Sequence, residues 1–208
     1  MSIQNHSVDV ARSLRSPENA ALRREMLHAP HLAPLRKYVT ALRNLHPKRE
    51  FPDFDPLDGG CNADVLFLLE KPGRMTSIAG AGSGFISRNN DDPTAEAIFE
   101  FMIKAGLPRE RTVIWNVVGG WNGTRKVTSR ELRQGVEDLK GLIPLLPSLR
   151  TIVLVGQKAH RSKAHIESQP TFSNIQIYCS AHPSPIVRAT QNELWKTIPS
   201  IWAKARNY

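Results

Sequence analysis

This chain of 208 residues contains very little cysteine and no long apolar segment. Its two cysteines, Cys61 and Cys179, are too few for a disulfide framework and lack the close spacing of a metal site. We therefore expect reduced thiols in a cytosolic protein. No apolar run approaches the ~20 residues that cross a bilayer, and nothing resembles a signal peptide, so we do not expect a membrane protein.

Acidic residues are also in deficit. The sequence holds 28 Lys and Arg against 19 Asp and Glu, which gives a formal net charge of +9. This excess indicates a polyanionic partner, nucleic acid before membrane, or else a basic surface that is merely solvated. The content of 40% hydrophobic and 23% charged residues is ordinary for a globular protein. A chain of this length buries roughly 70% of its unfolded surface in one domain.

What the sequence does contain is an alternation of strand-like and helix-like patterns. Continuous apolar runs at 63–69, 112–118 and 151–155 predict strands buried on both faces, and the alternating segment 175–179 predicts a fourth strand nearer an edge. Helices are expected between and after these strands. Their apolar faces are predicted at Ile98, Phe99, Met102 and Ile103, at Leu132, Val136, Leu139, Leu142 and Ile143, and at Leu194, Ile198 and Trp202. This order predicts a three-layer α/β/α fold around a mainly parallel, four-stranded sheet.

The first 50 residues differ from the rest of the chain. Residues 1–50 are polar, basic and helix-prone, and they predict a helical extension packed on the main domain of residues 51–208. One helix is expected to begin at Pro17 and a second to run over 31–45. The prolines and paired glycines of 46–63 predict a connector without regular structure.

Polar or glycine-containing segments lie at the end of each predicted strand or directly after it. They are Glu70-Lys71-Pro72-Gly73, Trp115-Asn116-Val117-Val118, Gly156-Gln157-Lys158-Ala159 and His182-Pro183-Ser184-Pro185. Parallel sheets bind ligands at the carboxyl ends of their strands. We therefore expect these segments to converge on one rim of the sheet.

Glu70 and His182 are the candidate catalytic residues. A carboxylate at Glu70 can stabilise a cationic sugar or activate a water, as cleavage of a glycosidic bond requires; the alternative is an exposed acid paired with Lys71. His182 can hydrogen-bond an oxygen on which negative charge develops, such as the carbonyl of a leaving base. Histidine also occurs in turns without any chemical role.

Asn116 and Phe85, together with Glu70 and His182, are the candidates for binding a base. The amide of Asn116 offers both a donor and an acceptor, which a uracil edge also presents; the alternative is an asparagine satisfied by backbone. Phe85 lies after a glycine-rich loop and can stack on a flipped base. The alternative for Phe85 is a place in the core, the commoner fate of phenylalanine.

A further set of residues is predicted to contact DNA, with simple turns or solvated surface as the alternatives. The set comprises Lys71, Pro72, Gly73 and Arg74, then Gly156, Gln157 and Lys158, then Ser184, Pro185 and Arg188. No metal site is expected. His160 and His165 are five residues apart, without an acidic or cysteine partner nearby.

Taken together, these motifs resemble the active-site loops of the uracil-DNA glycosylase superfamily over about residues 59–204. Glu70, Pro72 and Gly73 match the first motif, which reads Gly-Glu-Ala-Pro-Gly in the iron–sulfur branch of that family. Phe85 is similar to the family's base-stacking aromatic residue.

The resemblance extends to the later motifs. Asn116, within Trp-Asn-Val-Val, is similar to the family's uracil-reading asparagine. His182-Pro183-Ser184-Pro185 matches the last motif, whose histidine assists departure of the base and whose loop probes the DNA minor groove.

The sequence also departs from the family pattern. Leu69 replaces the usual glycine, and Lys71 occupies the position where some branches carry a catalytic Asp or Asn. The four cysteines that bind the cluster in the iron–sulfur branch are absent, so no cofactor is expected. The chain therefore resembles a divergent branch of the family.

The resemblance implies a monofunctional DNA glycosylase of base excision repair. It would hydrolyse the N-glycosidic bond of uracil in single- or double-stranded DNA and leave an abasic site. Glu70 would help the water or the sugar cation, and His182 would stabilise the uracil anion. A monomer in the bacterial cytoplasm is expected. Two alternatives are a protein that binds uracil or abasic DNA with little turnover, and a nucleotide-handling α/β enzyme.

Overall fold

The computed structural model describes residues 9–207, and a sheet of four parallel strands lies at its centre. The strands are β2 (Val65–Leu69), β4 (Thr112–Asn116), β5 (Thr151–Val155) and β6 (Gln176–Ser180), in the spatial order β4-β2-β5-β6. β2, β4 and β5 are buried along their whole length, whereas the edge strand β6 is mostly half-buried. The predicted parallel sheet and the edge position of its fourth strand are confirmed.

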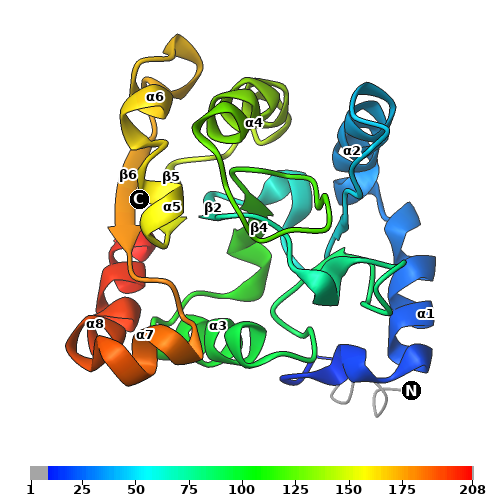
Figure 1. Ribbon diagram of the computed structural model, residues 1–208, viewed down its shortest axis with the longest axis horizontal. Helices are drawn as coiled ribbons and strands as arrows, with labels where there is room; N and C mark the ends of the chain where they lie inside the picture. The colour runs from blue at the N-terminus through cyan, green and yellow to red at the C-terminus, as the bar shows by residue number, and fades with distance from the viewer. Residues whose placement is uncertain (1–8, 208) are drawn as a thin grey trace.

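Helices cover both faces of the sheet and make the fold three-layered (Figure 1). One layer contains α2 (Ala33–Leu45), α4 (Ser129–Leu142) and α6 (Lys163–Glu167), and the other contains α3 (Pro93–Lys104), α7 (Pro185–Thr190) and α8 (Asn192–Ala203). α5 (Gln157–His160) is a single turn that directly follows β5. The predicted α/β/α fold class is therefore confirmed. Within residues 9–207, no helix has the length and apolar character needed to cross a membrane.

Side-chain caps determine where several helices begin. The Ser16 hydroxyl accepts a hydrogen bond from the Asn19 N–H at the start of α1 (Pro17–Glu25), as predicted. Thr128 and Glu131 form a reciprocal capping box at the start of α4. These caps satisfy backbone donors that the first helical turn leaves free.

The predicted apolar faces of α3 and α8 were partly wrong. Ile103 is 66% exposed and Leu194 is 51% exposed. α3 instead turns Phe101 toward α8, where its ring lies 4.8 Å from Trp195 and 6.0 Å from Trp202. Packing of this large ring sets the rotation of the helix, and an apolar residue on the other side is left in solvent.

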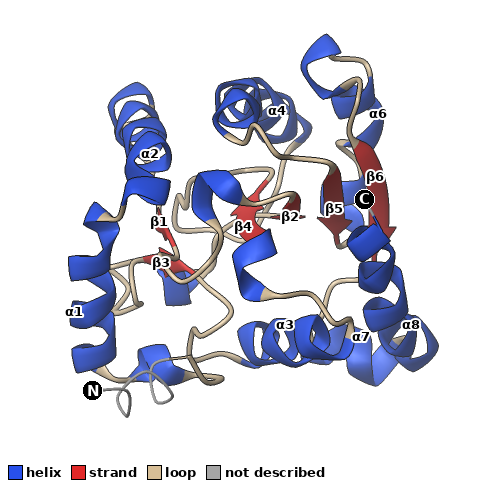
Figure 2. Ribbon diagram, turned by 180° about the vertical axis from the view of Figure 1, so that it is seen from behind, coloured by secondary structure: helices blue, strands red, loops and turns tan. Residues whose placement is uncertain are grey.

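A second, two-stranded parallel sheet lies next to α1 (Figure 2). It pairs β1 (Asp53–Phe54) with β3 (Phe85–Ile86). The Phe54 ring stacks on Trp115 of β4 at 4.3 Å, which joins the small sheet to the large one. The prediction that residues 46–63 lack regular structure was wrong at β1, because a strand of two residues has no periodicity to detect.

A buried ionic cluster connects the N-terminal helices to the rest of the molecule. Arg23 of α1 donates to Asp55 at 2.6 Å, and Arg109 donates to the same carboxylate at 2.6 Å and to Asp58 at 2.9 Å. Burial alone would raise the pKa of Asp55, but Arg109, Arg23 and a hydrogen bond from Ser87 hold it below its ordinary value. Segments far apart in the sequence are thus joined by charge.

Candidate active site

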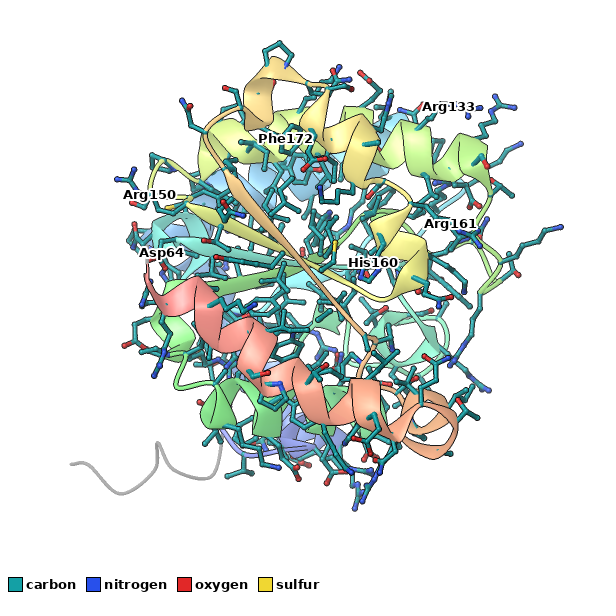
Figure 3. All side chains as sticks on the ribbon, turned by 90° about the vertical axis from the view of Figure 1, so that its left-hand side faces the viewer. Asp64, Arg133, Arg150, His160, Arg161 and Phe172 are labelled. Carbon is teal, nitrogen blue, oxygen red and sulfur yellow. The ribbon has the colours of Figure 1, made fainter. Side chains whose placement is uncertain are left out.

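The carboxyl ends of the four parallel strands lie on one side of the molecule, which we call the rim. Figure 3 shows the strands running from an end near Asp64 and Arg150 to an end near His160 and Arg161. Asp64 directly precedes β2 and Arg150 directly precedes β5, whereas His160 and Arg161 follow β5. The end near His160 and Arg161 is therefore the rim.

Glu70 follows β2, and its carboxylate lies against the start of α5. Its Oε1 accepts the backbone N–H of Lys158 at 3.1 Å, and its Oε2 lies 3.3 Å from the Lys158 ammonium. The Glu70 carbonyl accepts the N–H of Val118 at 3.0 Å, so the segments after β2, β4 and β5 meet here. Glu70 therefore pairs with Lys158 and not with the adjacent Lys71.

Gly156 allows Glu70 and His182 to lie side by side. Its φ of +94° falls in a region that residues with a side chain rarely adopt. A Cβ at this position would lie 2.8 Å from Glu70 Oε1 and 3.0 Å from His182 Cδ2, so both candidate catalytic side chains would have to shift. The two candidate catalytic side chains thus converge on one glycine, as the predicted meeting of the strand ends requires.

His182 follows β6 and is half-buried. Burial lowers its pKa below the ordinary value of 6.5; the Glu70 carboxylate opposes this shift, while the charges of Lys158 and Arg125 add to it. The imidazole is therefore neutral at pH 7. A neutral imidazole at this position can donate one N–H to an oxygen that becomes negative during a reaction.

Asn116, the last residue of β4, is the clearest sign of a ligand. It is 1% exposed, yet neither Oδ1 nor Nδ2 has a hydrogen-bond partner within the described residues. Buried amides are nearly always satisfied, and an unsatisfied group costs about 1–3 kcal/mol. Backbone satisfaction, the alternative for this residue, does not occur here. A ligand with one donor and one acceptor would complete the site.

Phe85 lies in β3, and its ring is 1% exposed. It packs in a small apolar cluster with Leu14 and Ala20, against which Leu27 also rests. This position corresponds to the alternative of a buried phenylalanine. Leu14 and Ala20 cover the ring, so a base could stack on it only if these residues moved. The stacking role of Phe85 stays a prediction.

Lys71 is directed toward α4. Its ammonium donates to Glu131 Oε1 at 2.8 Å and to the Lys126 carbonyl at 3.0 Å, and its side chain is 3% exposed. Burial would raise the pKa of Glu131, but the hydrogen bonds from Lys71 and Thr128 lower it. Sequence reasoning missed Glu131 as part of the site, although the Thr128-x-x-Glu131 spacing was the signal that could have revealed it.

The other residues predicted to contact DNA are placed around the same rim. Pro72 is buried and Gly73 half-buried, whereas Arg74 and Gln157 are exposed. These positions leave Arg74 free to reach a phosphate and give Pro72 a packing role beside Glu70.

The segment after His182 continues into α7, a helix that the sequence analysis did not predict. The Ser184 hydroxyl caps α7 by accepting the Val187 N–H at 3.4 Å, and Pro185 occupies the first helical position. Arg188 is exposed, and its guanidinium carbon lies 5.9 Å from the centre of the Trp195 ring. Stacking of this kind orients Arg188 on the surface.

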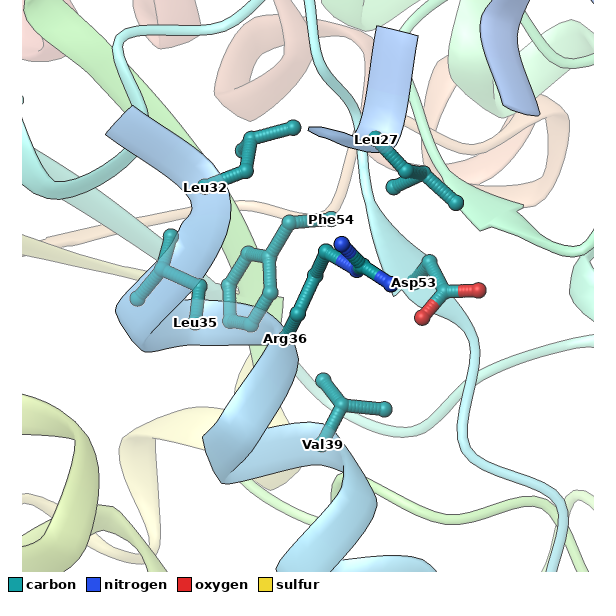
Figure 4. A pocket seen from close by; sticks show the side chains of 7 residues that line it. All are labelled: Leu27, Leu32, Leu35, Arg36, Val39, Asp53 and Phe54. Atoms are coloured by element: carbon teal, nitrogen blue, oxygen red, sulfur yellow. The ribbon is translucent and has the colours of Figure 1, made fainter. Parts of the chain in front are cut away.

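Two other kinds of candidate site were sought among the described residues: a cluster of metal ligands and a pocket away from the rim. In the part of the chain from 9 to 207, no three His, Cys, Asp or Glu side chains gather as metal ligands. His160 instead lies 2.9 Å from the Ser180 carbonyl. Figure 4 shows a hollow between α2 and β1, lined in part by Leu35, Val39 and Phe54. None of the predicted site residues lines it, so we assign it no role.

Comparisons with known proteins found one matching family and similar solved structures. A family model described as the uracil DNA glycosylase superfamily matches residues 57–206. One similar solved structure is an NMR structure titled "putative Uracil DNA glycosylase" from Methanosarcina acetivorans; it is 16% identical, with a TM-score of 0.48, over 70% of this chain and 92% of that chain. No curated protein matches the chain.

Proposed function

Because the chain belongs to the uracil DNA glycosylase superfamily, whose model matches residues 57–206, we propose that it excises uracil from DNA. Membership of the family supports a glycosylase-type role, and the proposal adds that uracil is the base excised. The observation that carries the proposal is the buried amide of Asn116 without a partner. Its Nδ2 can donate to the O4 of uracil while its Oδ1 accepts the N3–H, which satisfies both groups.

The bond to be broken joins C1′ of deoxyribose to N1 of the base. As it breaks, the electron pair leaves with the uracil and positive charge develops on the sugar. The Glu70 carboxylate can stabilise that cation or accept a proton from the water that adds to C1′. The N–H of neutral His182 can donate to the uracil oxygen that becomes negative. The products are free uracil and an abasic site.

The surface around these residues suits a DNA backbone. Arg74 and Arg188 are exposed at the rim, and Lys158 is partly exposed beside Glu70. Ile186 of α7 is 74% exposed directly after the His-Pro-Ser-Pro segment and can fill the space that a flipped base leaves in a duplex. Flipping costs least in single strands and mismatches, so we expect activity on single-stranded and mispaired uracil. We propose a monomer that acts in the bacterial cytoplasm.

Single-turnover cleavage of a uracil-containing oligonucleotide, single- and double-stranded, tests the proposal. Alkali treatment reveals the abasic sites that the wild-type protein forms. Glu70→Ala, Asn116→Ala and His182→Ala should each slow excision by about a hundredfold or more. Asn174→Ala, at an exposed position before β6, is the matched control and should match the wild type.

The same experiment separates a second candidate function. The Glu70 carboxylate is already occupied by Lys158, which favours tight binding of uracil or abasic DNA with little turnover. Selective binding by a wild-type protein that does not cleave would support this candidate against excision. Neither cleavage nor selective binding would contradict both.

A further inference from the structure

The loop between β4 and α4, residues 119–128, is held at both of its ends. Trp121 and Glu50 exchange two backbone hydrogen bonds of 2.8 Å each, in an antiparallel bridge. At the other end, Thr128 begins the capping box of α4 with Glu131. Since the loop directly follows β4, these contacts place its tip near the end of the strand that carries Asn116.

The tip of this loop is exposed and basic. Residues 122–126 read Asn-Gly-Thr-Arg-Lys, and all five are exposed. No acidic residue interrupts the segment, and the side chains of Arg125 and Lys126 form no hydrogen bond or ion pair with any described residue. Two unpaired cations therefore face the solvent from one short turn.

Lys71 and Glu131 determine where this tip lies. Lys71 donates to the Lys126 carbonyl at 3.0 Å and to Glu131 at 2.8 Å, and Asn122 donates to the same Glu131 oxygen at 3.2 Å. Because Lys71 is neutralised by Glu131, it adds little free charge of its own. Its position directly after Glu70 instead connects the tip to the candidate catalytic residue.

The tip also lies on the active-site side of the molecule. The charge of Arg125 is close enough to His182 to help lower the pKa of that imidazole. The geometric link is the hydrogen bond from Lys71, the residue after Glu70, to the carbonyl of Lys126, the residue after Arg125.

We propose that residues 122–126 form a phosphate-binding arm, with Arg125 and Lys126 contacting the backbone of the DNA strand that carries the target base. The Lys71–Glu131 pair is a positioning device that holds the arm in place. The identification of DNA as the ligand rests on the proposed function. Contacts of this kind hold the strand in register and carry no sequence information.

Equilibrium binding of a fluorescein-labelled, single-stranded oligonucleotide without uracil tests the arm. The double variant Arg125→Ala/Lys126→Ala should bind about five- to twentyfold more weakly at low salt. The slope of log K against log salt should be smaller by about 1.4, or ~0.7 for each lost contact. Arg150→Ala, at the opposite end of the strands (Figure 3), is the control and should leave the slope unchanged. An unchanged slope in the arm variant, or an equal change in the control, would overturn the proposal.

Glu131→Ala tests the positioning role sharply, because alanine removes both the negative charge and the oxygen to which Lys71 and Asn122 donate. Removal of a negative charge near the site should strengthen binding to DNA if charge alone matters. The arm proposal predicts the opposite, a severalfold weaker binding, because Lys71 and Asn122 lose their common anchor. Stronger binding would overturn the positioning role.

Lys71→Met gives an independent measurement of the same role. On its own it should weaken binding, whereas in the Arg125→Ala/Lys126→Ala background it should add no further loss. Additive losses would show that Lys71 contacts phosphate itself. Because undamaged DNA is the probe, these results stand whether or not uracil is excised, so failure of the arm and failure of the proposed function are distinguishable.

Discussion

Burial determines the hydrogen-bonding state of Asn116 and the protonation state of His182, two side chains at the rim. Asn116 is an ordinary amide that is buried without a hydrogen-bond partner among the described residues, which costs free energy. His182 is an ordinary imidazole whose surroundings keep it neutral. Both features follow from placing a polar side chain at the carboxyl end of a strand, and neither requires an unusual residue.

The neutral state of His182 predicts a pH dependence. Its pKa is lowered by burial, so the decrease of the excision rate with falling pH should be centred below pH 6.5, the ordinary pKa of histidine, where the imidazole takes up a proton. A single-turnover rate profile measures this, and NMR titration of the His182 ring assigns it. Lys158→Ala, which removes a neighbouring positive charge, should move the titration to higher pH. A His182 pKa of 6.5 or above in the wild type would contradict the argument.

The same shift affects stability, with a definite sign. The unfolded chain binds a proton on His182 at a higher pH than the folded chain does. Stability contributed by His182 is therefore present above pH 6.5 and is lost as pH falls toward the lower folded pKa.

The chemistry of individual residues was easier to predict from the sequence than their partners. Glu70, Asn116 and His182 could be selected because each stands at a predicted strand end. The pairing of Lys71 with Glu131, 60 positions later, could not be predicted, since nothing local to either residue indicates it. The burial of Phe85 under residues of the first 20 positions has the same cause: it depends on tertiary packing alone.

At the scale of elements, the turn after β5 is where the backbone matters most. Gly156→Ala should combine strain at a φ of +94° with clashes against Glu70 and His182. We expect a loss of about 1–3 kcal/mol of stability and a fall in excision of about a hundredfold. Thermal unfolding and single-turnover cleavage measure the two effects.

Gly106→Ala is the matched control for that substitution. Gly106 also has a positive φ, of +63°, at the end of α3, but the nearest atom to an added Cβ is the flexible tip of Arg206. It should lose similar stability and keep its excision rate. Equal losses of activity in the two variants would show that Gly156 matters only for folding.

Elements with a strong internal pattern were predictable, and those that depend on neighbours were not. The predicted range of β5, residues 151–155, agrees with the observed strand. The starts of α1 and α4 follow their capping residues, Ser16 and Thr128. The two-residue strands β1 and β3 escaped detection because their pairing joins residues 32 positions apart. The predicted face of α3 was right at Ile98 and Met102 and wrong at Ile103. More than one rotation of the helix satisfies the apolar period, and the rings of α8 decide between them.

For the molecule as a whole, charge is arranged at two depths. Exposed cations stand at the rim, where the proposed function requires a polyanion to bind, while Arg23, Arg109, Asp55 and Asp58 are buried together beside the small sheet. The exposed cations are part of the excess of Lys and Arg that gives the chain its net charge of +9. The buried cluster was invisible in the sequence, where arginine and aspartate are ordinarily surface residues.

The buried cluster leads to a prediction about how residues 1–50 relate to the rest of the chain. Asp55→Ala leaves Arg23 and Arg109 without their shared carboxylate, and Arg23 has a fully buried side chain. Breaking a buried pair of this kind costs about 3–5 kcal/mol. For a chain of this length, that loss lowers the Tm by roughly 10 °C. Because Asp55 joins segments from both predicted parts of the chain, unfolding should remain a single transition.

Arg15→Ala is the control for that experiment, since Arg15 pairs with Asp91 while its side chain is 67% exposed, and an exposed pair contributes about 0–1 kcal/mol. Calorimetry of the two variants and the wild type compares them directly. Excision by folded Asp55→Ala should persist at low temperature, because the cluster contacts none of the rim residues. Two separate transitions, or a loss no larger than that of Arg15→Ala, would mean that the helical extension folds independently. A single transition with a large loss would mean that the N-terminal helices belong to the same cooperative unit as the site.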